Sequence, residues 1–347
     1  MKFRTLLLVT AVSSVSAVAG LAQTTPPTAA PSTTAPTTLS TEEGQNRLVE
    51  AAQQRRPGPL VGTFTVDGNR IYNSPVLAAS RIVFKPGAKL IFSSEILQQR
   101  HEMFVFADEI ITMDPEKPGT ITWQKPTAEK AADLGSAAPG ADNATTENRP
   151  GGNGANGRRG IDGAAGERAP DVTIVTAKLG PTLVVDLTGG DGAGGGKGED
   201  GGQGGQGGHG NPASQGLTNC RKGAGRGDPG GNGGTGGSGG MGGAGGNGGV
   251  FTLVVPVGSI APLSRVMQVN LGSGKPGAPG AEGGPGGVGT GGPGGADARP
   301  LCRGEGPQGN PGGAGSAGSK GEAGKIGNAG SYFVGGMDPS DLDKILH

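Results

Sequence analysis

The sequence predicts an antiparallel bundle of glycine-rich polyproline II helices capped by short β-strands, with a small all-β N-terminal part. Three observations predict this fold class of mostly irregular and β structure. Of the 76 glycines in the 347-residue chain, 65 lie in residues 151–330. Glycine recurs there at every third position, which matches the three residues per turn of polyproline II. Short runs of β-branched and aromatic residues precede and interrupt this stretch.

Residues 1–22 have the pattern of a secretory signal peptide. Lys2 and Arg4 precede an apolar stretch that begins at Leu6, and the small residues Gly20 and Ala22 suit a cleavage site. No other segment is apolar over the length that a bilayer span needs. The sequence therefore predicts a protein that is secreted to the extracellular space or the cell envelope (periplasm or outer surface) and has no integral membrane span after cleavage.

The segment before the glycine-rich stretch divides into three parts. Residues 23–58 are expected to form a Pro/Thr/Ala-rich tether and a short helix, because prolines are frequent and large apolar residues are few. Residues 59–125 are expected to form a β-rich domain, with turn signals such as Pro86-Gly87 between short strands. The stretch IVFKPGAKLIF is typical of a parallel β-helix coil, and a small sandwich fits equally well. Residues 126–150 are expected to be a linker, and residues 335–347 a C-terminal tail.

Residues 151–334 are predicted to form the glycine-rich bundle with strand insertions. Glycine keeps a period of three in five runs, which are called run one to run five below: residues 151–166, 189–210, 227–248, 274–295 and 306–330. Apolar segments and cysteine-containing loops alternate between the runs. If each run is straight and the chain reverses at each interruption, the strands lie at one end and both cysteine loops at the other.

Cys220 and Cys302 are therefore expected to meet and to form a disulfide, although 82 positions (302 − 220) separate them in the sequence. Export to an oxidising compartment would permit this bond. Runs two and three consist largely of Gly-Gly-x triplets, which offer two faces without side chains. These two runs are expected to be the most enclosed, because close approach of neighbouring backbones requires glycine.

The Gly-Gly-x triplets and the cysteine pair give residues 151–334 a resemblance to glycine-rich polyproline II bundle proteins. Such bundles occur in springtail antifreeze proteins and in the receptor-binding tips of phage tail-fibre adhesins, and bacterial chains of this kind are commonly described as collagen-like. The resemblance implies a backbone architecture. Its functional implication is broad, because these proteins bind ice, surface receptors or protein partners.

Candidate chemistry is sparse. Asp191, Glu199 and Asp200 lie near glycine-rich turns, but the alternating apolar residues of a calcium β-roll are missing, so solvated surface charge is expected. The three histidines show no catalytic or metal-ligand spacing. The sequence therefore predicts no catalytic residue, no metal and no cofactor. A possible surface-contact motif is the tripeptide Arg226-Gly227-Asp228, which follows the first cysteine loop.

These observations favour a non-enzymatic structural or cell-surface protein, which presents a rigid rod for adhesion or for contact with the envelope or extracellular matrix. The expected partner is a protein or glycan of that surface. Nucleic acid is not expected, because 29 basic residues balance 29 acidic ones. The oligomeric state stays open.

Two alternatives remain. One is a carbohydrate-active β-helix enzyme in residues 60–125, and the other is an ice-binding protein. The segment is short for the long groove of such enzymes, and its carboxylates lie at strand ends or in turns, without an evident clustered acid pair: Asp108, Glu109, Asp114 and Glu116.

Overall fold

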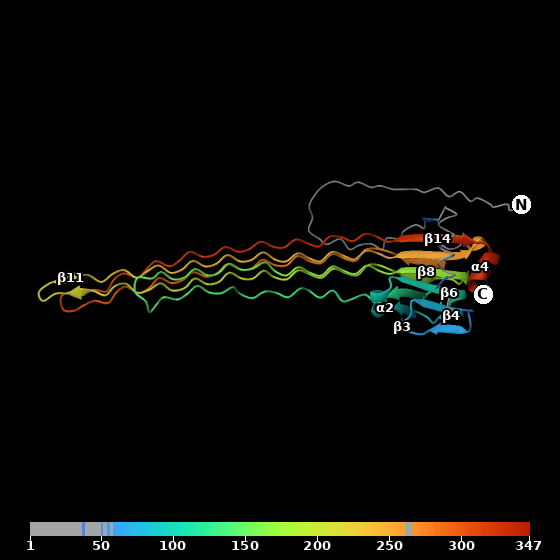
Figure 1. The fold of residues 1–347 in the computed structure, drawn as a ribbon, viewed down its shortest axis with the longest axis horizontal. Coiled ribbons are helices and arrows are strands. Elements are labelled where there is room, and N and C mark those ends of the chain that lie inside the picture. The colour runs from blue at the N-terminus through green and yellow to red at the C-terminus, as the bar shows by residue number, and fades with distance from the viewer. Residues whose placement is uncertain (1–36, 39–49, 51–53, 56–57, 261–265) are drawn as a thin grey trace.

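The computed structural model describes residues 37–38, 50, 54–55, 58–260 and 266–347. The chain forms a body of two parallel β-sheets and a long rod that projects from one side of it (Figure 1). The predicted signal peptide, residues 1–22, lies outside the described residues, and so does most of the predicted tether.

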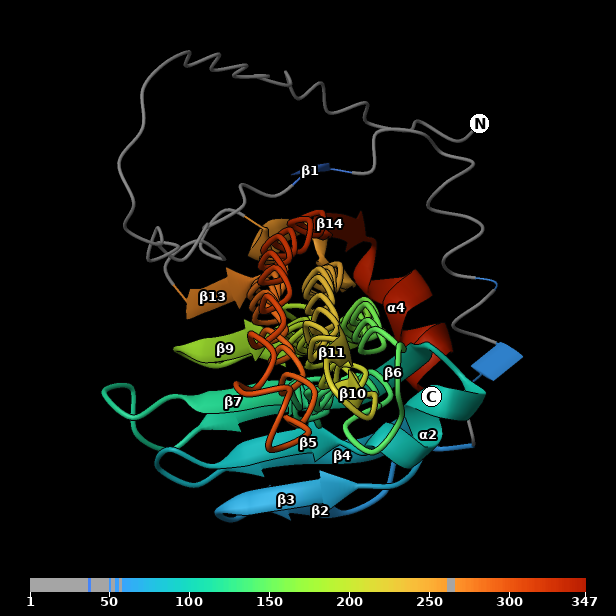
Figure 2. The same cartoon turned by 90° about the vertical axis from the view of Figure 1, so that its left-hand side faces the viewer.

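Strands that are consecutive in the sequence mostly belong to different sheets of the body. Every pairing within these two sheets is parallel (Figure 2). In the described chain, the first sheet has seven strands in the spatial order β1 (Thr37–Thr38), β14 (Ser331–Met337), β12 (Val250–Pro256), β8 (Asp171–Leu179), β6 (Glu102–Thr112), β4 (Val76–Phe84) and β2 (Thr63–Val66). The second has five, in the order β13 (Met267–Asn270), β9 (Leu183–Asp186), β7 (Gly119–Trp123), β5 (Lys89–Phe92) and β3 (Asn69–Tyr72).

Tight turns carry the chain from one sheet to the other. Gly68 lies between β2 and β3 with φ of 58°, and Gly87 lies between β4 and β5 with φ of 70°. Both values fall in the left-handed region, which glycine adopts without steric cost. The N–H of Gly87 also donates to the carbonyl of Lys117 in the next turn, at 2.8 Å. Successive turns are therefore stacked on one another as the strands are.

The core lies between the two sheets and is built from side-chain ladders. Parallel pairing in register places apolar residues from successive strands of the first sheet in one row, and all of them are buried: Leu77, Val105, Ile174, Leu253 and Val334. Each such row buries apolar side chains that belong to distant parts of the sequence, which stabilises the stack.

The outer face of the first sheet carries a second apolar cluster. Phe104 and Phe106 of β6 point away from the inter-sheet core, as the two-residue period of a strand requires. The helix α4 (Pro339–Leu346) covers them with Leu342, Ile345 and Leu346, each 1% exposed. The other described helices are α2 (Ser94–Gln99) and the short 3-10 helix η1 (Val257–Ser259).

The predicted fold class is wrong. Two large parallel β-sheets with few helices form the folded core, not an antiparallel bundle of polyproline II helices with strands as caps. The N-terminal strands are also not a separate all-β part, because β6 pairs with β8 and β7 with β9. The physical reason is that each glycine-rich excursion leaves and re-enters the body at the same side. Every new strand then continues in the direction of the previous one and extends the same sheets.

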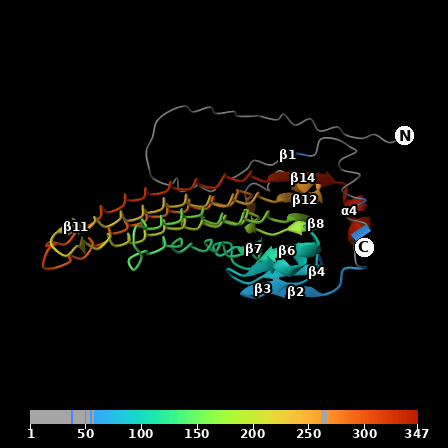
Figure 3. The ribbon, with the colours of Figure 1, turned by 60° about the vertical axis from the view of Figure 1, so that its left-hand side comes forward.

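Within the described part of residues 126–330, which excludes 261–265, the rod contains six extended segments. They lie side by side (Figure 3). Residues 126–142, here called the leading segment, follow β7 and run away from the body, and run one returns to β8. Runs two and four also lead outward, and runs three and five return to β12 and β14. The stretch 126–150, which was expected to be a linker, thus contributes a segment of the rod.

Backbone hydrogen bonds arrange the outward segments in one layer. The N–H of Ala137 in the leading segment donates to the carbonyl of Asp200 in run two, at 2.8 Å. The N–H of Gly198 in run two donates to the carbonyl of Ala281 in run four, at 3.0 Å. These bonds repeat every three residues, and the three segments run parallel.

The returning segments form the second layer in the same way. Run one donates to run three, for example from Gly157 to the carbonyl of Thr235 at 2.8 Å. Run three donates to run five, for example from Gly236 to the carbonyl of Ser316 at 2.8 Å. Runs two and three occupy the middle of their layers and have neighbours in both, so they are the most enclosed, as their paired glycines predict.

Contacts within and between the layers require glycine. The N–H of Gly237 in run three donates to the carbonyl of Glu199 at 2.8 Å, and its own carbonyl accepts from the N–H of Gly283 at 2.9 Å. A Cβ atom added to Gly237 would overlap the carbonyl oxygen of Arg158 in run one. The rod therefore satisfies its backbone polar groups by close contact between segments, which side chains at these positions would prevent.

Candidate functional site

The far end of the rod is the candidate functional site. It consists of two loops, residues 212–224 and 297–305, which together are called the tip. The tip is the part of the described chain that lies farthest along the rod from the body (Figure 1). Loops on a rigid scaffold are where proteins most often carry recognition residues.

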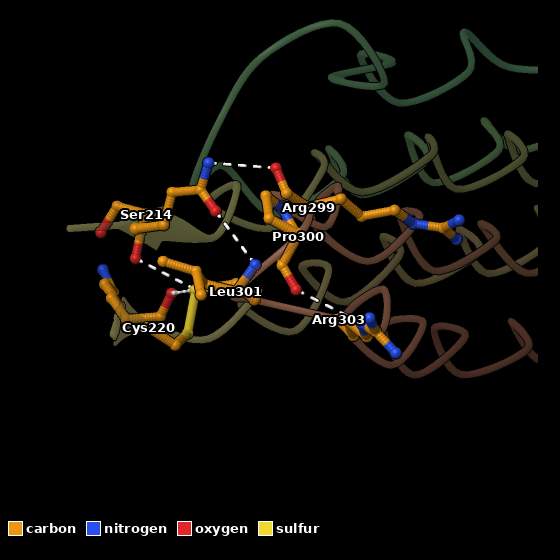
Figure 4. Close-up of a disulfide and its surroundings, with 9 residues drawn as sticks. Ser214, Cys220, Arg299, Pro300, Leu301 and Arg303 are labelled. Atoms are coloured by element: carbon orange, nitrogen blue, oxygen red, sulfur yellow. Dashed lines mark hydrogen bonds between the residues drawn. A yellow bond between two sulfur atoms is a disulfide. The ribbon is translucent and has the colours of Figure 1, made fainter. Parts of the chain in front are cut away.

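A disulfide joins the two loops (Figure 4). Cys220 and Cys302 are bonded with their Cα atoms 4.9 Å apart, so the predicted pairing is confirmed. Cys302 is buried, with 3% of its surface exposed, whereas Cys220 is exposed. The bond closes a sequence separation of 82 residues and thereby fixes runs two, three, four and five at their outer ends.

Hydrogen bonds hold the loops in one arrangement around the disulfide. The Gln215 side chain donates from Nε2 to the carbonyl of Arg299 at 3.0 Å and accepts at Oε1 from the N–H of Leu301 at 3.1 Å. Gln215 belongs to the short strand β10 (Ser214–Gln215), which pairs with β11 (Cys220–Lys222) in antiparallel fashion. The tip is thus a structured surface and not two independent loops.

Four of the six charged residues in the two loops of the tip are basic. Arg221, Lys222 and Arg303 are exposed. Over the ranges that the structure describes, no carboxylate lies within ion-pair distance of these three side chains. Arg299, by contrast, pairs with Asp297 at 2.8 Å. Arg303 donates from Nε to the carbonyl of Pro300 at 3.3 Å, but this leaves its positive charge, like those of Arg221 and Lys222, without a carboxylate partner in the described chain.

Apolar surface accompanies these cations. Leu217 is 100% exposed, and Leu301 is 39% exposed. The predicted contact motif lies nearby but is partly engaged in the rod: Gly227 is buried, and Arg226 donates to the carbonyl of Gln308 at 3.2 Å and to Oδ1 of Asn310 at 2.5 Å. The Oδ2 atom of Asp228 is buried without a hydrogen-bond partner. Binding by this tripeptide stays a prediction.

The carboxylates considered for calcium hold neighbouring segments together. Asp191 accepts at Oδ1 from the N–H of Lys275 at 2.8 Å. Asp200 accepts from the N–H of Gly284 at 2.5 Å and from Lys197 Nζ at 2.7 Å. The Lys197 hydrogen bond, followed by that of Gly284, lowers the pKa of Asp200.

Glu199 was predicted to be a solvated surface charge, but it is buried, with 8% of its surface exposed. Asparagine and aspartate side chains repeat the role of Asp191 between other segments; for example, Asn153 accepts at Oδ1 from the N–H of Asn232 at 2.9 Å. Within the described part of the chain, no group of three His, Cys, Asp or Glu side chains is placed to bind a metal ion.

Two of the carboxylates considered for glycosidic chemistry are engaged by other groups of the body. Glu109 lies between Lys178 Nζ at 2.6 Å and Arg81 Nε at 3.0 Å, on three neighbouring strands. The hydrogen bond from Lys178 is the main cause that lowers the pKa of Glu109. Asp114 accepts from the N–H of Glu116 at 2.9 Å in the turn after β6.

Sequence reasoning missed the three unpaired cations of the tip. The signal was present as Cys220-Arg221 and Cys302-Arg303, since each joined cysteine is followed by arginine. Arg226-Gly227-Asp228 drew attention instead because it matches a short motif. The described helices are too short or too polar to cross a bilayer.

Comparison with known proteins gives no family for the chain. No protein-family model and no curated protein matches it. A solved structure that does match is the springtail antifreeze protein from Granisotoma rainieri, a bundle of nine polyproline type II helices whose crystal waters match the ice lattice. The identity is 23%, the match covers 57% of this chain and 96% of that chain, and the TM-score is 0.08.

The predicted resemblance to the glycine-rich polyproline II bundle proteins is wrong, because the core of this chain is two parallel sheets. Neither ice binding nor any other activity is transferred from that protein.

Proposed function

We propose that this chain is an exported, non-enzymatic structural or surface protein that uses its rod to hold the tip away from the body for adhesion to a cell surface or extracellular matrix. The observation that carries the proposal is the position of the disulfide-closed tip at the far end of the rod. A bond at that place adds rigidity where a contact surface would need it.

Two further features support the proposal. The rod is held together by backbone hydrogen bonds along its length, so it can act as a spacer of fixed length. The disulfide agrees with an oxidising compartment, which the predicted signal peptide in residues 1–22 would supply.

The test is retention of the labelled full-length protein on intact cells of the producing organism and on matrix stripped from those cells. A short folded epitope inserted between Leu217 and Thr218 covers the tip, and the same epitope fused after His347 in the body is the matched control. We expect wild type and the control to be retained and the tip insertion to be lost.

Equal retention of the tip insertion would show that the tip is not the contact surface. If wild-type protein is retained on neither cells nor matrix, the adhesive role is wrong.

A further inference from the structure

We infer that the tip binds an acidic polysaccharide through Arg221, Lys222 and Arg303. This inference rests on the proposed function and names the chemical class of its ligand. The three residues are hereafter called the basic cluster.

The disulfide assembles the basic cluster from two distant parts of the chain. Arg221 and Arg303 each follow one of the two bonded cysteines, whose Cα atoms are 4.9 Å apart. Lys222 follows Arg221 on strand β11. The three residues thus belong to two loops that the disulfide and the Gln215 side chain hold together, and Figure 4 shows Arg303 beside the bonded cysteines.

The tip has a charge that the chain as a whole lacks. Its two loops contain four basic residues and two acidic ones, for a net charge of 4 − 2 = +2, whereas the whole chain has a net charge of zero. The acidic residues are Asp297, which is paired with Arg299, and Glu305. A positive end on an otherwise balanced molecule would favour contact of an anionic partner with this end first.

Other features of the tip favour a polysaccharide over nucleic acid. The loops contain no Phe, Tyr or Trp, so they lack the aromatic side chains on which unpaired bases stack. They do contain Thr218 and Asn219, which are exposed and can exchange hydrogen bonds with sugar hydroxyls. A linear polymer with spaced carboxylates matches a few separate cations and polar groups better than a continuous phosphate backbone.

The experiment measures retention of the full-length oxidised protein on immobilised polygalacturonate at low ionic strength, with neutral dextran as the blank. The test variant is R221A/K222A/R303A. The matched control is K275A/K320A/K325A, which removes three exposed lysines from the rod and leaves the tip intact. Thermal unfolding of each variant checks that the fold is kept.

We expect wild type and the control to be retained and the test variant to bind about tenfold more weakly, from a few tenths to one kcal/mol for each exposed charge pair. Retention should fall as salt rises, because exposed charges are screened. R221K/R303K should keep most of the affinity, since it preserves the charge.

Three results would overturn the inference: no retention of wild type on polygalacturonate, equal retention of the test variant, or an equal loss in the control. Tighter binding to immobilised duplex DNA than to polygalacturonate would also overturn the assignment to polysaccharide. Retention on cells that depends on the tip but not on the basic cluster would leave the proposed function standing and reject only this ligand class.

Discussion

The carboxylate of Glu199 in run two receives three hydrogen bonds from Arg158 in run one. The backbone N–H and Nε of Arg158 donate to Oε2, each at 2.9 Å, and Nη2 donates to Oε1 at 3.2 Å. The Glu199 side chain is only 10% exposed. The two layers of the rod are thus joined by a charged side-chain contact as well as by backbone hydrogen bonds.

Acid should destabilise the rod through this contact. The hydrogen bond from the Arg158 side chain is the main cause that lowers the pKa of Glu199 from its usual 4.5. Since the folded-state pKa lies below the unfolded one, the stabilisation is complete above about 4.5 and is lost as pH falls through the folded pKa. Asp200 and Asp133 shift in the same direction and should add to the effect.

We expect the thermal midpoint to fall between pH 7 and pH 3, and the fall to be smaller in Glu199→Gln, which is neutral at both pH values. The measurement is thermal unfolding followed by circular dichroism. An unchanged pH dependence in Glu199→Gln would argue against a role for this carboxylate.

A single methyl group in the rod should be costly. Gly237→Ala places a Cβ atom on the carbonyl oxygen of Arg158, so neighbouring segments have to move apart. Overpacking of this kind costs about 1–3 kcal/mol in the free energy of unfolding. Gly135→Ala is the matched control, because its Cβ would meet nothing within 4 Å, and it should change stability by at most ~0.5 kcal/mol. Chemical denaturation of both variants decides the matter; similar midpoints would contradict the close packing.

Removing the disulfide should loosen the tip first. Cys220→Ala/Cys302→Ala removes the bond that joins two positions 82 residues apart in the sequence. In small proteins, loss of a native disulfide lowers the free energy of unfolding by about 2–5 kcal/mol. Hydrogen exchange should become faster at the tip and in the outer ends of runs two to five, and stay slow in β8. Wild type under reducing conditions is the control and should match the double variant. Equal protection of the tip with and without the bond would rule out this stabilising role.

Truncating a buried side chain between the two sheets should lower the stability of the body. Ile174 is fully buried between Val105 and Leu253, so Ile174→Ala should destabilise by about 2–5 kcal/mol. Ile71 lies in strand β3 of the second sheet but is 55% exposed, so Ile71→Ala should have a much smaller effect. Denaturant unfolding compares the two. If both variants lose the same stability, the inter-sheet core is not where the structure places it.

Part of the rod was predictable from the positions of glycine. The period of three located the runs, and the interruptions between them placed Cys220 and Cys302 together. The hydrogen bonds that Asp and Asn side chains accept from the backbone of neighbouring segments were not predicted. An Asp or Asn directly before a glycine was the visible signal, as at Asp162, Asp191 and Asn232. Residues 126–142 were missed because the leading segment lies at the edge of its layer and keeps larger side chains such as Leu134.

The parallel sheets could not be predicted from local patterns. β7 and β9 are neighbours in space, yet residues 124–182 separate them in the sequence. Each strand alone looks like any short half-buried strand, and pairing depends on where the glycine-rich excursion returns. The basic cluster escaped prediction for a similar reason, because Arg221 and Arg303 belong to loops that come together only in the folded rod, where the disulfide joins them.

The arrangement of the rod in two layers constrains how its length can change. Run two bonds to run one in one direction and to run four in the other, and run three bonds to runs two and five. Because these bonds repeat every three residues, they could re-form one triplet further along after an insertion of one triplet into a single run, but that run would then end one triplet beyond its neighbours at the tip. Lengthening the outer part of the rod therefore requires a triplet in each of runs two, three, four and five together. The distance between the tip and the body can therefore change only by whole triplets, and each change involves all four runs.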